Sequence, residues 1–110
     1  MRMEKKKCLM VIIQDTDTWK GEQLHHVIVR MLQRRGLDGA TAFSGIAGFG
    51  ATRQIHGKGL FGVSDEKPIV ILAIDSEAKV KEAIEAVAPL VQEGLICTYD
   101  TEVVETDSAK

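Results

Sequence analysis

The sequence has few aromatic side chains and no excess of positive charge, and both shortages narrow the functions open to it. Phe, Trp and Tyr make up 5% of the 110 residues, so the core must consist mainly of Val, Ile, Leu and Ala. The formal net charge is −2, whereas non-specific binding of nucleic acid needs a basic surface. No apolar run approaches the ~20 residues that span a bilayer, so we expect no direct membrane insertion.

Cysteine is also scarce, because the chain contains only Cys8 and Cys97 and has no Cys-x-x-Cys motif. Both lie in apolar runs, which is typical of buried thiols in a reducing compartment, and a disulfide is the alternative. The apolar run Cys8–Ile13 is too short for a signal peptide. We therefore expect one cytoplasmic domain over residues 1–110, with flexible ends at 1–6 and 106–110.

Four apolar segments predict β-strands, and two amphipathic segments between them predict helices. The strands are expected at Cys8–Ile13, Ala40–Ile46, Pro68–Ile74 and Leu95–Val104. The order β-α-β-β-α-β is that of an α+β, ferredoxin-like fold, a four-stranded antiparallel sheet with two helices on one face. The first and third strands are apolar throughout. This predicts that both sheet faces are covered, and it favours a homo-oligomer.

Both expected helices have an apolar face and capping residues. The apolar positions of the first helix are Leu24, Val27, Ile28, Met31 and Leu32, and those of the second are Val80, Ala83, Ile84, Val87 and Val91. We expect Asp17 or Thr18 to cap the start of the first helix and Gly36 its end. Asp75 or Ser76 should cap the second helix, and Pro89 should kink or restart it near Val87. Trp19 is expected to pack on the first helix or to stack on a base.

A long connection rich in glycine and polar residues, 47–67, joins the second and third strands, and such loops tend to be functional. Gly45, Gly48 and Gly50 at its root can turn backbone N–H groups toward an anion, or they serve only a sharp turn or a bulge. Arg53, His56 and Lys58 are the cations best placed for a phosphate, and a solvated loop is the alternative for each.

The histidines and the hydroxyl residues do not form a recognisable catalytic or metal motif. His25 and His26 are consecutive on a helix, so they point about 100° apart and cannot easily share one ion. They could meet His56 and Asp15 or Asp17 in space, but the spacing typical of metal ligands is absent. No nucleophile and base stand in a known pattern, so we expect neither a metal site nor an enzyme.

The chain resembles the PII-like family of small uncharacterised bacterial and archaeal proteins, which are relatives of the nitrogen-regulatory PII signal proteins. The resemblance runs from about Lys7 to Val104. It is carried by the segments Asp15–Gly21, Gly36–Thr41, Gly45–Gly50, Pro68–Ile71 and Glu93–Ile96. It implies a ferredoxin-like fold, a homotrimer, no enzymatic activity, and signalling through the 47–67 loop. It also implies an adenine-type nucleotide bound between subunits, near Gly45, Gly48, Phe49, Gly50, Arg53, His56 and Lys58.

The sequence departs from the PII pattern at three points. Val91–Leu95 contains no lysine where PII proteins have a Lys-containing loop, Leu95–Val104 has no basic residue, and residues 47–67 include no tyrosine. A ligand with few phosphates, such as AMP or a cyclic nucleotide, therefore fits better than ATP. The alternative is an interaction module without a small ligand that acts on a membrane channel or transporter. Phe49, Leu60 and Phe61 would then be the apolar anchors.

Overall fold

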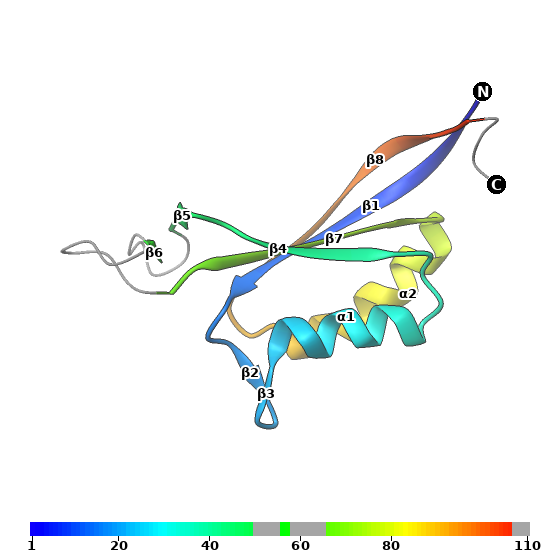
Figure 1. The fold of residues 1–110 in the computed structure, drawn as a ribbon. Coiled ribbons are helices and arrows are strands. Elements are labelled where there is room, and N and C mark those ends of the chain that lie inside the picture. Colours follow the sequence, from blue (N-terminus) through cyan, green and yellow to red (C-terminus); the bar gives the residue numbers. More distant parts are fainter. Residues whose placement is uncertain (50–55, 58–65, 107–110) are drawn as a thin grey trace.

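The computed structural model describes residues 1–49, 56–57 and 66–106. One antiparallel sheet has the strand order β4-β7-β1-β8, and both helices lie on the same face of it (Figure 1). The main elements are β1 (Arg2–Gln14), α1 (Leu24–Arg34), β4 (Ala40–Ser44), β7 (Pro68–Asp75), α2 (Glu77–Val87) and β8 (Leu95–Glu105). The predicted α+β, ferredoxin-like fold is confirmed. Among the described residues, no helix combines the length and the hydropathy needed to cross a bilayer.

The core lies between the sheet and the two helices. Side chains alternate between the faces of a strand, and the residues of β1 and β7 that point to the helices are Leu9, Val11, Ile13, Ile69, Ile71 and Ala73. Val11 pairs directly with Ile71 at the centre of this face. The helices contribute Leu24, Ile28 and Leu32 from α1 and Val80, Ala83 and Val87 from α2, as the apolar pattern predicts. Full burial of each Val, Leu or Ile side chain contributes about 1.5–3 kcal/mol to the free energy of folding.

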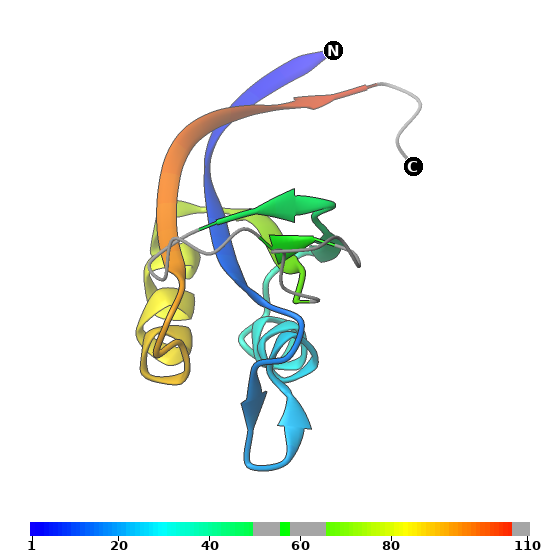
Figure 2. The ribbon, with the colours of Figure 1, turned by 90° about the vertical axis from the view of Figure 1, so that its left-hand side faces the viewer.

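The opposite face of the sheet, which we call the open face, is also apolar. Its central part consists of the paired residues Met10 and Leu72 and the paired residues Ile12 and Val70, all half-buried. Around them Phe43, Ile74, Leu95 and Tyr99 are between 40% and 52% exposed. No described helix covers this face (Figure 2). The expectation that both faces are covered is therefore not met within a single chain.

The start of α1 differs from the sequence prediction. A hairpin of β2 (Thr18–Trp19) and β3 (Glu22–Gln23) precedes the helix, and its turn places Lys20 at φ 50° and Gly21 at φ 85°. The helix therefore begins at Leu24 after Gln23, which makes no side-chain cap bond, and the predicted caps Asp17 and Thr18 are wrong. Asp17 Oδ2 instead accepts from the Gln14 N–H at 3.0 Å. Trp19 packs against the core, as one of its two interpretations predicts.

The other helix ends agree with the sequence prediction. Helix α1 ends at Arg34 with Arg35 as its C-cap, and Gly36 follows with φ 84°, a conformation that glycine adopts without strain. Ser76 caps α2 by accepting from the Lys79 N–H at 3.3 Å. The helix ends at Val87, and the short 3-10 helix η1 (Ala88–Leu90) carries Pro89, as expected of a proline that cannot continue the helix.

Beyond the end of β7, β1 and β8 continue as a two-stranded arm in which Arg2–Lys6 pair with Thr101–Glu105 (Figure 1). The sequence predicts a flexible end at 1–6, whereas the structure has Arg2–Lys6 in a strand. Opposite charges face each other across the arm: Arg2 pairs with Glu105, and Lys7 Nζ lies 2.6 Å from Asp100 Oδ1. The hydrogen bond with Asp100 raises the pKa of Lys7. Residues 107–110 lie outside the described part.

Asp75 is the buried charged residue among those described, with 5% of its surface exposed. Its Oδ1 accepts from the Ser76 N–H at 2.7 Å, and its Oδ2 accepts from the Asp38 N–H at 2.9 Å. Burial raises the pKa of the carboxyl, but these two donors together with Lys6 and Lys79 outweigh it, so the pKa lies below its usual value. The carboxylate thus joins the start of α2 to the connection between α1 and β4.

Replacement of Asp75 by Asn should destabilise the protein by about 1–3 kcal/mol at neutral pH, because the amide can satisfy only one of the two buried N–H donors. The folded-state pKa is depressed, so the carboxylate's contribution is present above the unfolded value of 3.8 and is lost as the pH falls below it. Urea unfolding at neutral pH and near pH 3 measures this difference. Asp38→Asn keeps both N–H donors and is the control. Equal stability of the two variants at neutral pH would contradict the assignment.

Candidate functional site

The two ends of the 47–67 connection meet where β4 ends and β7 begins. The Gly45 N–H donates to the carbonyl oxygen of Pro68 at 2.6 Å. A Cβ atom on Gly45 would lie 2.6 Å from Pro68 Cγ, which is too close for any side chain, whereas a Cβ on Gly48 would lie at an ordinary 3.7 Å. Gly45 therefore allows the backbone to pack on the proline ring. This contact supports the structural interpretation of that glycine.

A short ladder follows directly after this contact. β5 (Ala47–Gly48) pairs with β6 (His56–Gly57), and Gly48 lies opposite His56. The structure thus brings two predicted site residues together by their backbones, inside a connection for which the sequence predicts no strand. Phe49 follows Gly48 and is 63% exposed. Gly50, Arg53 and Lys58 lie outside the described residues, and His56 is described by its backbone alone, so their ligand roles stay predictions.

A second set of contacts, which the sequence analysis missed, holds the returning end of the connection. The Asp15 N–H donates to the carbonyl of Lys67 at 2.9 Å, and the Lys67 N–H donates to Asp15 Oδ1 at 3.2 Å. Beside them the Thr16 hydroxyl donates to the Glu66 carboxylate. The available signal was the turn former Asp15 directly after a buried strand. Together with the contact between Gly45 and Pro68, these bonds define what we call the root.

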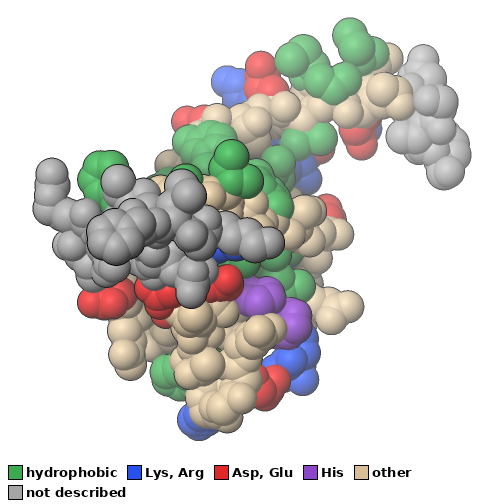
Figure 3. All heavy atoms as spheres, turned by 60° about the vertical axis from the view of Figure 1, so that its left-hand side comes forward, with side chains coloured by type: hydrophobic (Ala, Val, Ile, Leu, Met, Phe, Trp, Pro, Cys, Tyr) green, Lys and Arg blue, Asp and Glu red, His purple; other side chains and the backbone are tan. Residues whose placement is uncertain are grey.

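The root is acidic on its described side. Thr16 lies between Asp15 and Asp17 in the sequence, and its hydroxyl donates to Glu66. The three carboxylates are therefore close together. Figure 3 shows several Asp and Glu side chains gathered on one side of the molecule, with the histidines beside them. A multiply charged phosphate placed here would meet negative charge. Lys67 belongs to the root, and Arg53, His56 and Lys58 are the predicted cations that would offset this negative charge.

His25 and His26 lie at the start of α1, with ring centroids 4.3 Å apart. His25 is half-buried, and its buried Nδ1 has no hydrogen-bond partner. Burial lowers the pKa of His25, the neighbouring His26 lowers it further, and Asp15 opposes them. His25 is thus neutral at physiological pH. Within the described ranges, no three His, Cys, Asp or Glu side chains converge on a metal site, and a meeting with His56 stays a prediction.

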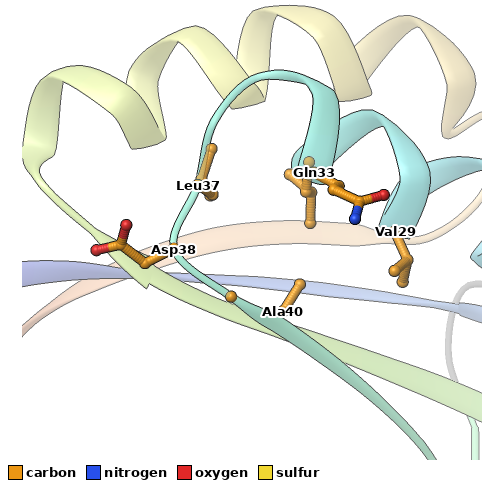
Figure 4. A pocket seen from close by; sticks show the side chains of 7 residues that line it. Val29, Gln33, Leu37, Asp38 and Ala40 are labelled. Atoms are coloured by element: carbon orange, nitrogen blue, oxygen red, sulfur yellow. The ribbon is translucent and has the colours of Figure 1, made fainter. Parts of the chain in front are cut away.

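Two further hollows in the described surface lie away from the predicted residues. One of about 240 Å³ lies between α1 and the start of β4 and is lined in part by Val29, Gln33 and Ala40 (Figure 4). The Asp38 carboxylate at its edge points away from it. The other, about 580 Å³, lies between the arm and the start of α2 and is lined mainly by charged residues. Because ligand pockets are typically about 300–1,000 Å³ and mostly apolar, neither matches one.

The family is shown by a direct comparison of sequences. Residues 6–103 match the model of the DUF190 family, described as an uncharacterised ancient conserved region. The chain belongs to the DUF190 family. It is 35% identical to a UPF0166 protein of Aquifex aeolicus over 104 residues, which cover 94% of this chain and 98% of that protein. The name of that relative states no function.

Solved structures place this DUF190 member in the PII-like fold. CPII of Thiomonas intermedia, a nitrogen regulatory PII-like protein solved with ADP, AMP and bicarbonate, is 21% identical. It superposes with a TM-score of 0.71 over 93% of this chain and 91% of its own. A PII-like signalling protein of Thermus thermophilus is 16% identical, with a TM-score of 0.64 over 94% of both chains. The predicted resemblance to the PII-like family is therefore confirmed for the fold.

Substitution of Gly45 by Ala should destabilise the protein by about 1–3 kcal/mol, because the rigid proline ring cannot move out of the way of the new methyl group. Gly48→Ala adds the same methyl group where there is room, and we expect a change below about 0.5 kcal/mol. Thermal unfolding of both variants without added ligand measures the difference. A Gly45→Ala protein as stable as Gly48→Ala would show that the close packing is not required.

Proposed function

We propose that this protein is a non-enzymatic PII-like regulator that binds an adenine nucleotide such as AMP and signals through the 47–67 segment. The observation that carries the proposal is the root, where one end of the segment is fixed at Pro68 and the other at Asp15. A ligand bound beside Gly48 and His56 acts directly on the segment that leaves this point. The likeness to CPII, solved with ADP and AMP, supports the choice of an adenine nucleotide.

The proposed signal needs only the arrival or loss of one phosphate charge beside the 47–67 segment. A phosphate that contacts the backbone near Gly48 and the cations Arg53, His56 and Lys58 favours one conformation of the 47–67 segment. Loss of the nucleotide removes that preference, and a partner surface is presented or withdrawn. Ordering of a segment by a phosphate is a common switch in proteins.

The charge of the root favours a ligand with few phosphates. Asp15, Asp17 and Glu66 are carboxylates on the described side, and each further phosphate group adds repulsion from them. The predicted cations number three at most, and the last strand adds none. AMP or a cyclic nucleotide therefore fits this root better than ATP, in line with the departures of the sequence from PII proteins.

A homotrimer is part of the proposal, because the open face must be covered. Met10, Ile12, Val70 and Leu72 form a continuous apolar surface on the two central strands. Such a surface is costly to leave in water, and large exposed patches of this kind mark interfaces. Association of three copies through their open faces covers it. The clefts between copies then adjoin the root, where the nucleotide would bind.

A second candidate function is an interaction module that acts on a membrane channel or transporter without a small ligand. The exposure of Phe49 at the start of the segment favours it, since aromatic residues are common anchors in interfaces. Leu60 and Phe61, its further predicted anchors, lie outside the described residues. Under this function a Phe61→Ala variant loses its partner but keeps its oligomeric state.

Isothermal titration with AMP, ADP, ATP and cyclic dinucleotides tests the nucleotide. We expect AMP or a cyclic nucleotide to bind more tightly than ATP. Arg53→Ala should weaken binding about tenfold or more, because it removes a charged donor to phosphate. Arg35→Ala at the far end of α1 removes the same charge and is the control. The absence of heat from every nucleotide would remove this function and leave the interaction module.

The trimer is tested by a charge on the open face. Ile74 is 40% exposed there, so Ile74→Glu should leave the single chain folded while it prevents association. Light scattering should show the 12.1 kDa chain as a monomer. Ala78→Glu adds the same charge on the exposed side of α2 and should remain a trimer. An Ile74→Glu protein that still forms trimers would place the interface elsewhere.

A further inference from the structure

Three sulfur-containing side chains lie together on the open face, and the proposed nucleotide binding uses none of them. Cys8 and Met10 are two residues apart on β1, so their side chains lie on the same face of the sheet. Cys97 on β8 pairs directly with Met10, and Tyr99 pairs directly with Cys8. Both cysteines are free thiols. We call Cys8, Met10 and Cys97 the sulfur cluster.

The strand register sets the spacing of the cluster. Directly opposite side chains have Cβ atoms about 4.5–5.5 Å apart, which is the relation of Met10 to Cys97. Cys8 is the diagonal neighbour of Cys97, and diagonal pairs are about 7–8 Å apart. A disulfide needs Cβ atoms about 3.5–4.5 Å apart, so this diagonal does not suit one. A metal ion with bonds of about 2.3 Å to each sulfur can join two thiolates across that longer distance.

The surroundings of the cluster suit a soft ion. Cys8 is 2% exposed, its thiol lies 3.9 Å from the carbonyl oxygen of Leu9, and the hydroxyl of Tyr99 hydrogen-bonds with it. The half-buried residues Ile12 and Leu72 adjoin Met10 along and across the strands and limit the access of water. The Tyr99 hydroxyl can donate to a thiolate, which offsets part of the cost of a buried negative charge.

From this placement we propose that Cys8, Cys97 and Met10 bind one soft monovalent cation, Cu(I), on the open face. Thiolate and thioether sulfur together select Cu(I), whereas zinc sites use thiolate, imidazole or carboxylate and take four ligands. Within the described residues no His, Asp or Glu completes a set with the two cysteines, so the thioether of Met10 is the third ligand. Binding releases the two thiol protons as the thiolates form.

Anaerobic titration of the reduced full chain with Cu(I), in competition with bicinchoninate, tests the site. We expect one Cu(I) per chain and X-ray absorption dominated by copper–sulfur scattering. Cys97→Ser should weaken binding at least about tenfold, and Met10→Leu should weaken it by a smaller factor. Met3→Leu removes a thioether from the same strand at an exposed position and is the matched control. Zn(II) should bind more weakly than Cu(I).

Two readouts keep the test independent of folding. Met10→Leu conserves volume, so circular dichroism should be unchanged while Cu(I) affinity falls. In the wild-type protein, binding of Cu(I) in a weak buffer should release two protons per copper ion, one from each thiol. The proposal is overturned if Cys97→Ser binds Cu(I) as tightly as Met3→Leu does. It is equally overturned if Zn(II) binds as tightly as Cu(I), or if Met10→Leu leaves affinity unchanged.

Discussion

The packing of the central strands β1 and β7 against the two helices is the constraint on which the rest of this structure depends. Their alternate residues point in opposite directions, and both sets are apolar. One set, with Val11 and Ile71 at its centre, is covered by α1 and α2. The other set, with Met10 and Leu72 at its centre, has no described helix over it. Within a single chain, the described helices therefore bury only one of the two apolar faces of the central strands.

The two regions to which we assign functions, the open face and the root, lie in different parts of the fold. The open face is an apolar surface suited to other copies of the chain and contains the sulfur cluster. The root lies at the end of β4 and β7, where Gly45 packs on Pro68 and Asp15 bonds to Lys67. β7 belongs to both regions, since Pro68 lies at the root and Val70 and Leu72 lie on the open face. The proposed regulation by a ligand between copies would use this strand to connect them.

Charge divides the molecule in a similar way. The arm has oppositely charged residues facing each other, such as Arg2 and Glu105, which are exposed and so contribute little to stability. Buried Asp75 is different, because its two backbone donors join separate parts of the chain. The acidic root is different again, since its carboxylates would repel an approaching anion. Local surroundings, not the net charge of −2, determine the role of each group.

The sequence by itself determined the fold, the apolar faces of both helices, and the ends marked by Gly36, Ser76 and Pro89. These features follow from apolar periodicity and from local backbone chemistry, and both depend on residues that are close in the sequence. Tertiary structure alone decided what depends on distant partners. It made a strand of Arg2–Lys6 through pairing with β8, and it gave Gly45 a steric role through Pro68. It also joined Asp15 to Lys67, which are 52 positions apart, because a sequence pattern does not indicate which distant backbone will lie beside it.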